Sequence, residues 1–118
     1  MKLTGNSMWL LKQRQIGELK YIRMQLIHQD NPGTGGQFKA LEKDQLAGTI
    51  TYLWHDEDLL EINHTEVDEA YEGKGIGKKL ADAVVDLARE QNARIKATCR
   101  FAKSVLLRDE AAKDMLID

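Results

Sequence analysis

A glycine-rich run at residues 72–77 (EGKGIG) constrains the fold of this chain more than any other feature. A strand-like segment ends at Val67, a short acidic connection follows, and after Gly77 the pattern becomes that of an amphipathic helix. The first N–H groups of a helix have no carbonyl partner within the helix, so such a turn gathers free donors. Glycine also reaches positive φ and lets a ligand approach the backbone closely. The sequence therefore predicts an anion site here, with a pyrophosphate as the expected occupant.

Composition limits the classes of protein that fit. The chain has 118 residues, enough for one domain, with 42% hydrophobic and 31% charged residues, as in ordinary soluble proteins. A formal net charge of -2 argues against a nucleic-acid-binding surface, and no apolar run approaches the roughly 18 residues of a membrane span. The single cysteine excludes an internal disulfide and a Cys-based zinc site, and the histidines show no metal-ligand spacing. We expect a cytoplasmic protein without a metal and without nucleic-acid or membrane partners.

Residues 1–23 differ from the rest of the chain. Apolar residues are scattered through them with a basic excess, and Gly5 and Gly17 weaken a helical interpretation. We predict an N-terminal extension over 1–23 and a folded domain over 24–118. The extension is either a loosely attached arm or a dimerisation segment, so the protein is expected to be a monomer or a homodimer.

The remaining pattern predicts a mixed α+β fold. Alternating polarity predicts strands over 24–28, 37–42, 46–55 and 59–67, and the last three of these form an antiparallel meander. A stripe of apolar residues from Ile76 to Ala88 predicts a helix that ends at Gln91 and Asn92. Residues 93–99 predict a further strand, parallel to 59–67 because a helix connects the two. A last helix is predicted over 104–116.

Three segments together, 64–67 (HTEV), 73–77 (GKGIG) and 98–103 (TCRFAK), resemble the small single-domain branch of the GNAT acyl-CoA N-acetyltransferase superfamily. The likeness covers residues 24–118. It implies that strands 59–67 and 93–99 splay apart, that acetyl-CoA is the co-substrate, and that its pantetheine arm lies in the opening. The implied CoA-binding residues are Thr65, Val67, Glu72, Gly73, Lys74, Gly75, Ile76, Gly77 and Lys78.

The chain departs from the pattern of that branch at three places. Glu72 stands where the glycine motif usually opens with Arg or Gln. Ala97 and Arg100 replace prolines around the cysteine, and Asp109 and Glu110 replace a His-Pro pair.

The resemblance implies that Cys99 is a nucleophile that accepts the acetyl group. The residues alone are equally consistent with a buried, inert thiol. His64 is predicted either as a general base for Cys99 or for the amine, or as a structural histidine. Glu66 is the other candidate base, or an exposed carboxylate, and Tyr71 is either a general acid or a packing residue.

The function expected from these observations is acetyl-CoA-dependent N-acetyl transfer to an unidentified amine, directly or through a cysteine thioester. The alternative is a non-catalytic CoA-binding or interaction module.

Overall fold

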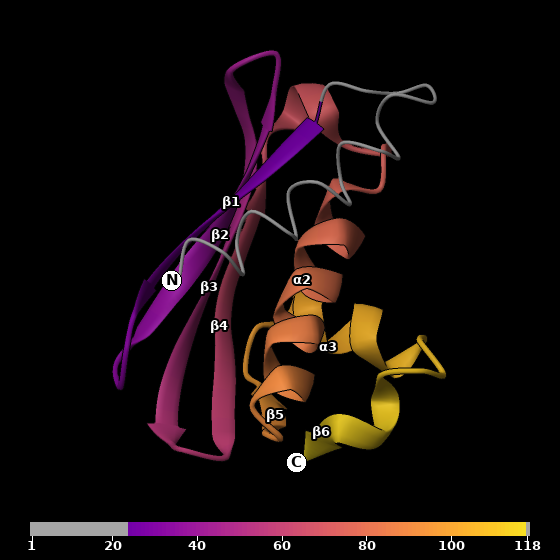
Figure 1. Ribbon diagram of the computed structural model, residues 1–118. Helices are drawn as coiled ribbons and strands as arrows, with labels where there is room; N and C mark the ends of the chain where they lie inside the picture. The colour runs from indigo at the N-terminus through magenta and orange to yellow at the C-terminus, as the bar shows by residue number, and fades with distance from the viewer. Residues whose placement is uncertain (1–23, 118) are drawn as a thin grey trace.

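A computed structural model describes residues 24–117, which build a single six-stranded sheet with strand order β1-β2-β3-β4-β5-β6 (Figure 1). The first four strands pair antiparallel, whereas β5 and β6 each join the sheet in parallel with the preceding strand. The strands are β1 (Met24–Asn31), β2 (Gly35–Glu42), β3 (Gln45–Asp56), β4 (Leu59–Val67), β5 (Arg94–Ala97) and β6 (Leu116–Ile117). The helices are α2 (Ile76–Glu90) and α3 (Arg100–Leu107), with the short 3-10 helices η2 (Glu69–Tyr71) and η3 (Lys113–Met115).

The predicted α+β architecture, an antiparallel meander followed by a helix and a parallel strand, is confirmed. The predicted strand over 59–67 has the bounds of β4. Compared with the predictions, β1 ends three residues later, β2 begins two residues earlier, and β3 is one residue longer at each end. The strand predicted over 93–99 is shorter, because the chain leaves the sheet after Ala97. The extension predicted over 1–23 lies outside the described residues.

The helix predicted over 104–116 is wrong in both bounds. Helix α3 begins at Arg100 and ends at Leu107, and the chain then passes through η3 into β6. The side chain of Asp109 accepts a hydrogen bond from the Ala111 N–H (3.0 Å), and its carbonyl accepts from Ala112 and Lys113. An aspartate that bonds its own following backbone favours a turn over a continued helix, which accounts for the early end.

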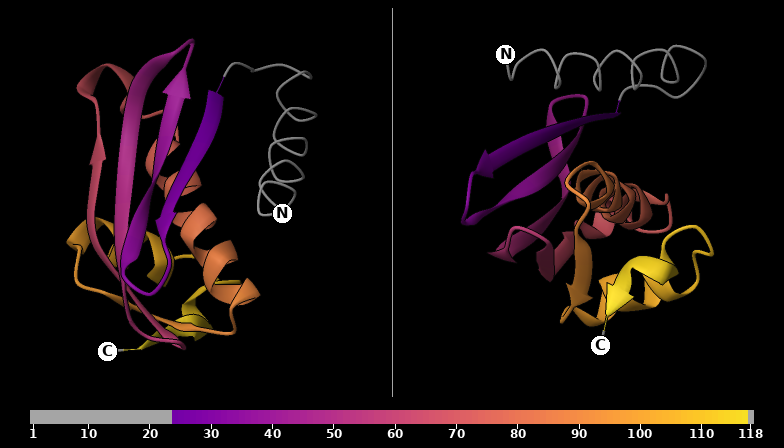
Figure 2. Two further views of the ribbon diagram at one scale, coloured as in Figure 1. Left: turned by 60° about the vertical axis from the view of Figure 1, so that its left-hand side comes forward. Right: turned by 60° about the horizontal axis from the view of Figure 1, so that its bottom comes forward.

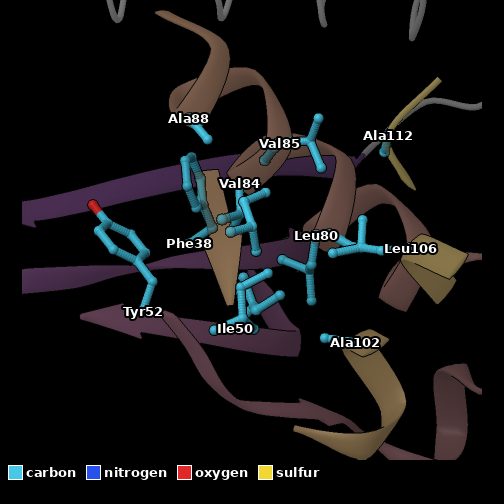
Figure 3. Packing of buried hydrophobic residues seen from close by; sticks show 14 of the residues in the cluster. Phe38, Ile50, Tyr52, Leu80, Val84, Val85, Ala88, Ala102, Leu106 and Ala112 are labelled. Atoms are coloured by element: carbon cyan, nitrogen blue, oxygen red, sulfur yellow. The ribbon is translucent and has the colours of Figure 1, made fainter. Parts of the chain in front are cut away.

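Helix α2 covers one face of the sheet with its apolar stripe (Figure 3). Leu80, Val84 and Ala88 are fully excluded from solvent and face buried residues of the antiparallel strands such as Phe38 and Ile50. Helix α3 lies beside α2 and contributes buried Ala102 and Leu106 to the same core (Figures 2 and 3). The predicted stripe on α2 is therefore the face that holds the two layers together. No helix in the described part of the chain has the length and apolarity required to cross a membrane.

A polar network is built into the antiparallel half. The hydroxyl of Tyr52, a side chain only 1% exposed, donates to Asp30 Oδ1 at 2.5 Å and lies 2.7 Å from His28 Nε2. The His28 ring stacks on Phe38 with centroids 4.1 Å apart. Burial lowers the pKa of His28, and burial together with the Asp30 hydrogen bond raises the pKa of Tyr52 well above its usual range. Both side chains therefore favour their neutral forms, and the network ties β1 to β3.

A β-bulge interrupts the pairing of β3 with β4. Thr51 pairs with His64 and Tyr52 pairs with Ile62, which leaves Asn63 without an opposite residue. The Thr51 hydroxyl donates to Asn63 Oδ1 at 2.7 Å. A bulge bends its strand and changes which residues share a face.

The bulge decides which side chains near the end of β4 turn toward the helices. Thr65 and Val67 are half-buried, and Val67 packs against the core, whereas His64 and Glu66 are exposed. Because side chains alternate along a strand, His64 and Glu66 lie on the face of the sheet opposite to Thr65 and Val67.

Candidate functional site

The strands β4 and β5 diverge at the middle of the molecule. They pair only from Leu59 with Arg94 to Ile62 with Ala97. The carbonyl of Ile62 then accepts hydrogen bonds from the N–H groups of both Thr98 (3.1 Å) and Cys99 (3.2 Å). Beyond this point β4 continues to Val67, whereas the segment that follows β5 leaves the sheet and enters α3. The result is an opening between two parallel strands.

Backbone donors of β4 point into this opening. The Asp68 N–H donates to the Ala47 carbonyl at 2.8 Å, and in an antiparallel ladder every second residue bonds the same neighbour. Glu66 therefore bonds toward β3, and the N–H groups of Thr65 and Val67 point the other way. The opening thus receives two backbone donors that the sheet does not use.

The glycine turn supplies a second group of donors. Gly73 (φ 81°) and Gly75 (φ 77°) adopt the left-handed conformation, and a Cβ at either position would meet no atom within 4 Å. The requirement at both positions is therefore conformational rather than spatial. Gly75 caps α2 without a side-chain hydrogen bond, and the first helical bond runs from Lys79 to Gly75. The N–H groups of residues 76–78 are consequently available at the start of the helix.

Gly77 has a different role from the other two glycines. It lies within the first turn of α2, and a Cβ there would collide with the ring of Phe101 from α3. The third glycine therefore makes room for a neighbouring side chain, a reason that the motif alone does not reveal.

Both groups of donors border one cavity of about 660 Å³. Its wall combines the end of β4, the glycine turn and the first turn of α2 with one face of α3 and the segment after it. The lining residues are Thr65, Val67, Tyr71, Glu72, Gly73, Gly75, Ile76, Gly77, Lys78, Phe101, Val105, Arg108, Asp109 and Glu110. The predicted CoA-binding residues are thus brought together, except that Lys74 is not part of the wall.

The contribution of α3 and the following segment was missed by sequence reasoning. Phe101, Val105 and Arg108 are spaced i, i+4 and i+7, which puts them on one face of a helix. That spacing is a usable signal only once the helix is known to begin at Arg100. The helix predicted over 104–116 excluded Phe101 and hid the pattern.

Cys99 lies beside the cavity rather than in its wall. It is the N-cap residue of α3, is half-buried, and its Sγ donates to Thr65 Oγ1 at 3.4 Å. The preceding Thr98 hydroxyl donates to Glu61 and fixes the strand end. This hydrogen bond, followed by that of His55, lowers the pKa of the Glu61 carboxyl. The thiol is therefore held at the point where the two strands separate.

The two candidate bases lie elsewhere. His64 and Glu66 are exposed, their Nε2 and Oε1 atoms are 3.9 Å apart, and they face away from Thr65 across β4. The structure brings these two side chains together, but the hydrogen-bond partner of the Cys99 thiol is Thr65 rather than His64. Within residues 24–117, no group of His, Cys, Asp and Glu side chains is arranged to hold a metal ion.

Comparisons with known proteins agree with this geometry. Residues 37–115 match the family described as GCN5-related N-acetyl-transferase. A GCN5-like protein of Staphylococcus aureus, solved in solution by NMR, is 33% identical with a TM-score of 0.60, covering 78% of this chain and 88% of its own. A GNAT-family acetyltransferase of Elizabethkingia anophelis with acetyl-CoA bound shares the fold at 19% identity and a TM-score of 0.54, over 64% of this chain and 52% of its own.

Among curated proteins, the chain is similar to protein NATD1. The match to the Bos taurus protein is 38% identical over 52 residues, which is 44% of this chain and 46% of that protein. The chain therefore spans about half the length of the curated relatives it matches. The extent of the family match, the similarity to the Staphylococcus aureus protein and the opening between β4 and β5 lead to one conclusion: this chain belongs to the GCN5-related N-acetyltransferase family.

Proposed function

We propose that this protein is an acetyl-CoA-dependent N-acetyltransferase that moves an acetyl group from the CoA thioester to an amine. The observation that carries the proposal is the convergence of unused backbone donors, from β4 and from the start of α2, on one cavity beside Cys99. Donors at a helix start suit a diphosphate, and donors along an open strand suit the amide groups of pantetheine.

The residues of β4 would also assist the chemical step. The N–H groups of Thr65 and Val67 point into the opening, where a thioester carbonyl of CoA would lie. A backbone N–H aimed at that oxygen stabilises the negative charge that develops on it during nucleophilic attack. This contribution requires no titratable side chain, which fits a cavity wall whose described residues include no histidine.

Two routes to the amine fit this site. In the first, the amine attacks the thioester carbonyl carbon directly, the carbon–sulfur bond to CoA breaks, and the amine loses a proton. In the second, the Cys99 thiolate makes the first attack and releases CoA, and the amine then displaces Cys99 from its acetyl thioester. His64 and Glu66 face the side of β4 opposite to the cavity, so they suit a base for an amine that arrives from that side.

The test is intact-mass measurement after incubation with acetyl-CoA in the absence of an acceptor. The wild-type chain and Cys99→Ala are compared, and calorimetry measures CoA binding by both. One acetyl group on the wild type alone supports the cysteine route. CoA binding by both proteins without an adduct leaves direct transfer, which a panel of amines tests through acetylated product and released CoA.

The alternative, a CoA-binding module without transferase activity, is favoured by the hydrogen-bond partner of the Cys99 thiol, which is the hydroxyl of Thr65 rather than a basic side chain. Binding of acetyl-CoA with neither adduct nor product would support that alternative. Absence of CoA binding would contradict both functions.

A further inference from the structure

The charges around the cavity are unusual for a diphosphate site. Among residues 24–117, its wall contains three carboxylates, Glu72, Asp109 and Glu110, and two cationic side chains, Lys78 and Arg108. Glu72 places one of these negative charges directly before the glycine turn. An anionic ligand therefore needs a positive side chain from elsewhere in the wall.

Lys78 is already engaged by two carboxylates. Its Nζ lies 3.2 Å from Asp82 Oδ2 and 3.8 Å from Asp109 Oδ2, and the hydrogen bond to Asp82 is the main cause of its raised pKa. Lys74 is not part of the wall, and its Nζ lies 5.6 Å from the centre of the Tyr71 ring. Neither lysine is therefore a free cation facing the ligand.

Arg108 is in a different situation. It is an exposed side chain at the C-cap of α3, on the helix face that lines the cavity, and no carboxylate from residues 24–117 pairs with it. Its neighbour Asp109 reaches Lys78 in the first turn of α2, which places the end of α3 close to the glycine turn. Glu110, the next residue, pairs with Lys113 at 3.3 Å.

We propose that Arg108 binds the diphosphate of CoA and offsets the negative charge of Glu72 in the cavity wall. The guanidinium presents two parallel N–H donors to phosphate oxygens, a geometry that an ammonium group does not offer. The diphosphate is then held from two sides, by backbone N–H groups of α2 and by one side chain of α3. This inference rests on the proposed function, because it assigns a residue to the same CoA site.

The experiment compares Arg108→Gln with Lys103→Gln. Both changes remove one positive charge from α3, both side chains are exposed, and Lys103 is not in the cavity wall. Calorimetry measures binding of CoA, dephospho-CoA and pantetheine to each variant and to the wild type. We expect Arg108→Gln to weaken CoA and dephospho-CoA binding by about ten- to a hundred-fold, the range of charge-assisted hydrogen bonds, and to leave pantetheine binding unchanged. Lys103→Gln is expected to bind like the wild type.

The outcomes separate the inference from the proposed function. Equal CoA affinity of the two variants would overturn the role of Arg108 while leaving the CoA site intact. A loss seen with CoA but not with dephospho-CoA would place Arg108 at the 3′-phosphate and would also overturn the assignment. A wild-type protein that binds no CoA would overturn both proposals. Thermal unfolding of the two variants checks that each is folded.

Discussion

The antiparallel and parallel parts of the sheet are built in opposite ways. Strands β1 and β2 pair over their whole lengths, from Met24 with Glu42 to Asn31 with Gly35, and hydrogen bonds of the buried Tyr52 tie β1 to β3. Strands β4 and β5 separate after Ile62, and backbone donors of β4 remain without a strand partner. In the antiparallel part, backbone hydrogen bonds between strands stabilise the sheet. In the parallel part, the backbone N–H groups at the end of β4 make no bond to β5. The cavity of this small domain is thus formed where the sheet is left incomplete.

The largest expected effect comes from opening the core of the antiparallel part. Leu26→Ala removes a side chain that is 3% exposed in β1, whereas Leu53→Ala changes one that is 38% exposed in β3. We expect the first to lower the free energy of unfolding by about 2–5 kcal/mol and the second by less than about 1 kcal/mol. Denaturant unfolding measures both values. If the two parts are separable, folded Leu26→Ala binds CoA with the same affinity as the wild type. A CoA affinity that falls together with the free energy of unfolding would contradict the separation of the two parts.

A matched pair of glycines probes the two parts at equal backbone strain. Gly33 (φ 81°) lies in the turn between β1 and β2, Gly75 (φ 77°) lies at the start of α2, and neither has a neighbour near an added Cβ. Alanine at either position is expected to reduce the free energy of unfolding by roughly 1–2 kcal/mol. Only Gly75→Ala is expected to weaken CoA binding, because it disturbs the donors at the helix start. Similar CoA affinities for both variants would argue that the turn does not bind the ligand.

The smallest expected effect concerns acid stability at the junction of the two parts. The Thr98 and His55 hydrogen bonds lower the pKa of Glu61 in the folded state. A lowered pKa means that the unfolded state binds the proton more readily, so the stabilisation is present above the unfolded pKa and disappears as the pH falls through the folded pKa. Glu61→Gln is therefore expected to flatten the loss of stability between roughly pH 5 and pH 3. Unfolding curves of both proteins across that range provide the measurement, and parallel curves would show that Glu61 is not responsible.

The sequence predicted the parts of the fold that depend on local pattern. Alternating residues identified the meander, the apolar stripe identified α2, and the glycine run identified the turn before it. Helix α3 was misplaced because its N-cap is Cys99, which gives no polar capping signal, and because the turn at Asp109 looks helical in apolar spacing. The position of Arg108 in the cavity wall depends on those bounds and was missed with them.

The register of strand pairing was harder still to predict from the sequence. Asn63 is polar and lies between two strand residues, and nothing in its immediate sequence marks it as unpaired. The bulge arises from the register of β3 against β4, which is a property of two segments together. The separation of His64 from Cys99 follows from it, so that separation was also beyond the sequence pattern.

The unpaired residue in β4 works like a shift of reading frame within the strand. Deleting Asn63 would remove the bulge and bring His64 directly after Ile62, so Thr65 and Val67 would keep the cavity face of the strand and His64 and Glu66 would keep the opposite face. A one-residue deletion at this point of β4 is therefore expected to keep the two faces of the strand, whereas a one-residue insertion or deletion at a regularly paired position would exchange them beyond that position.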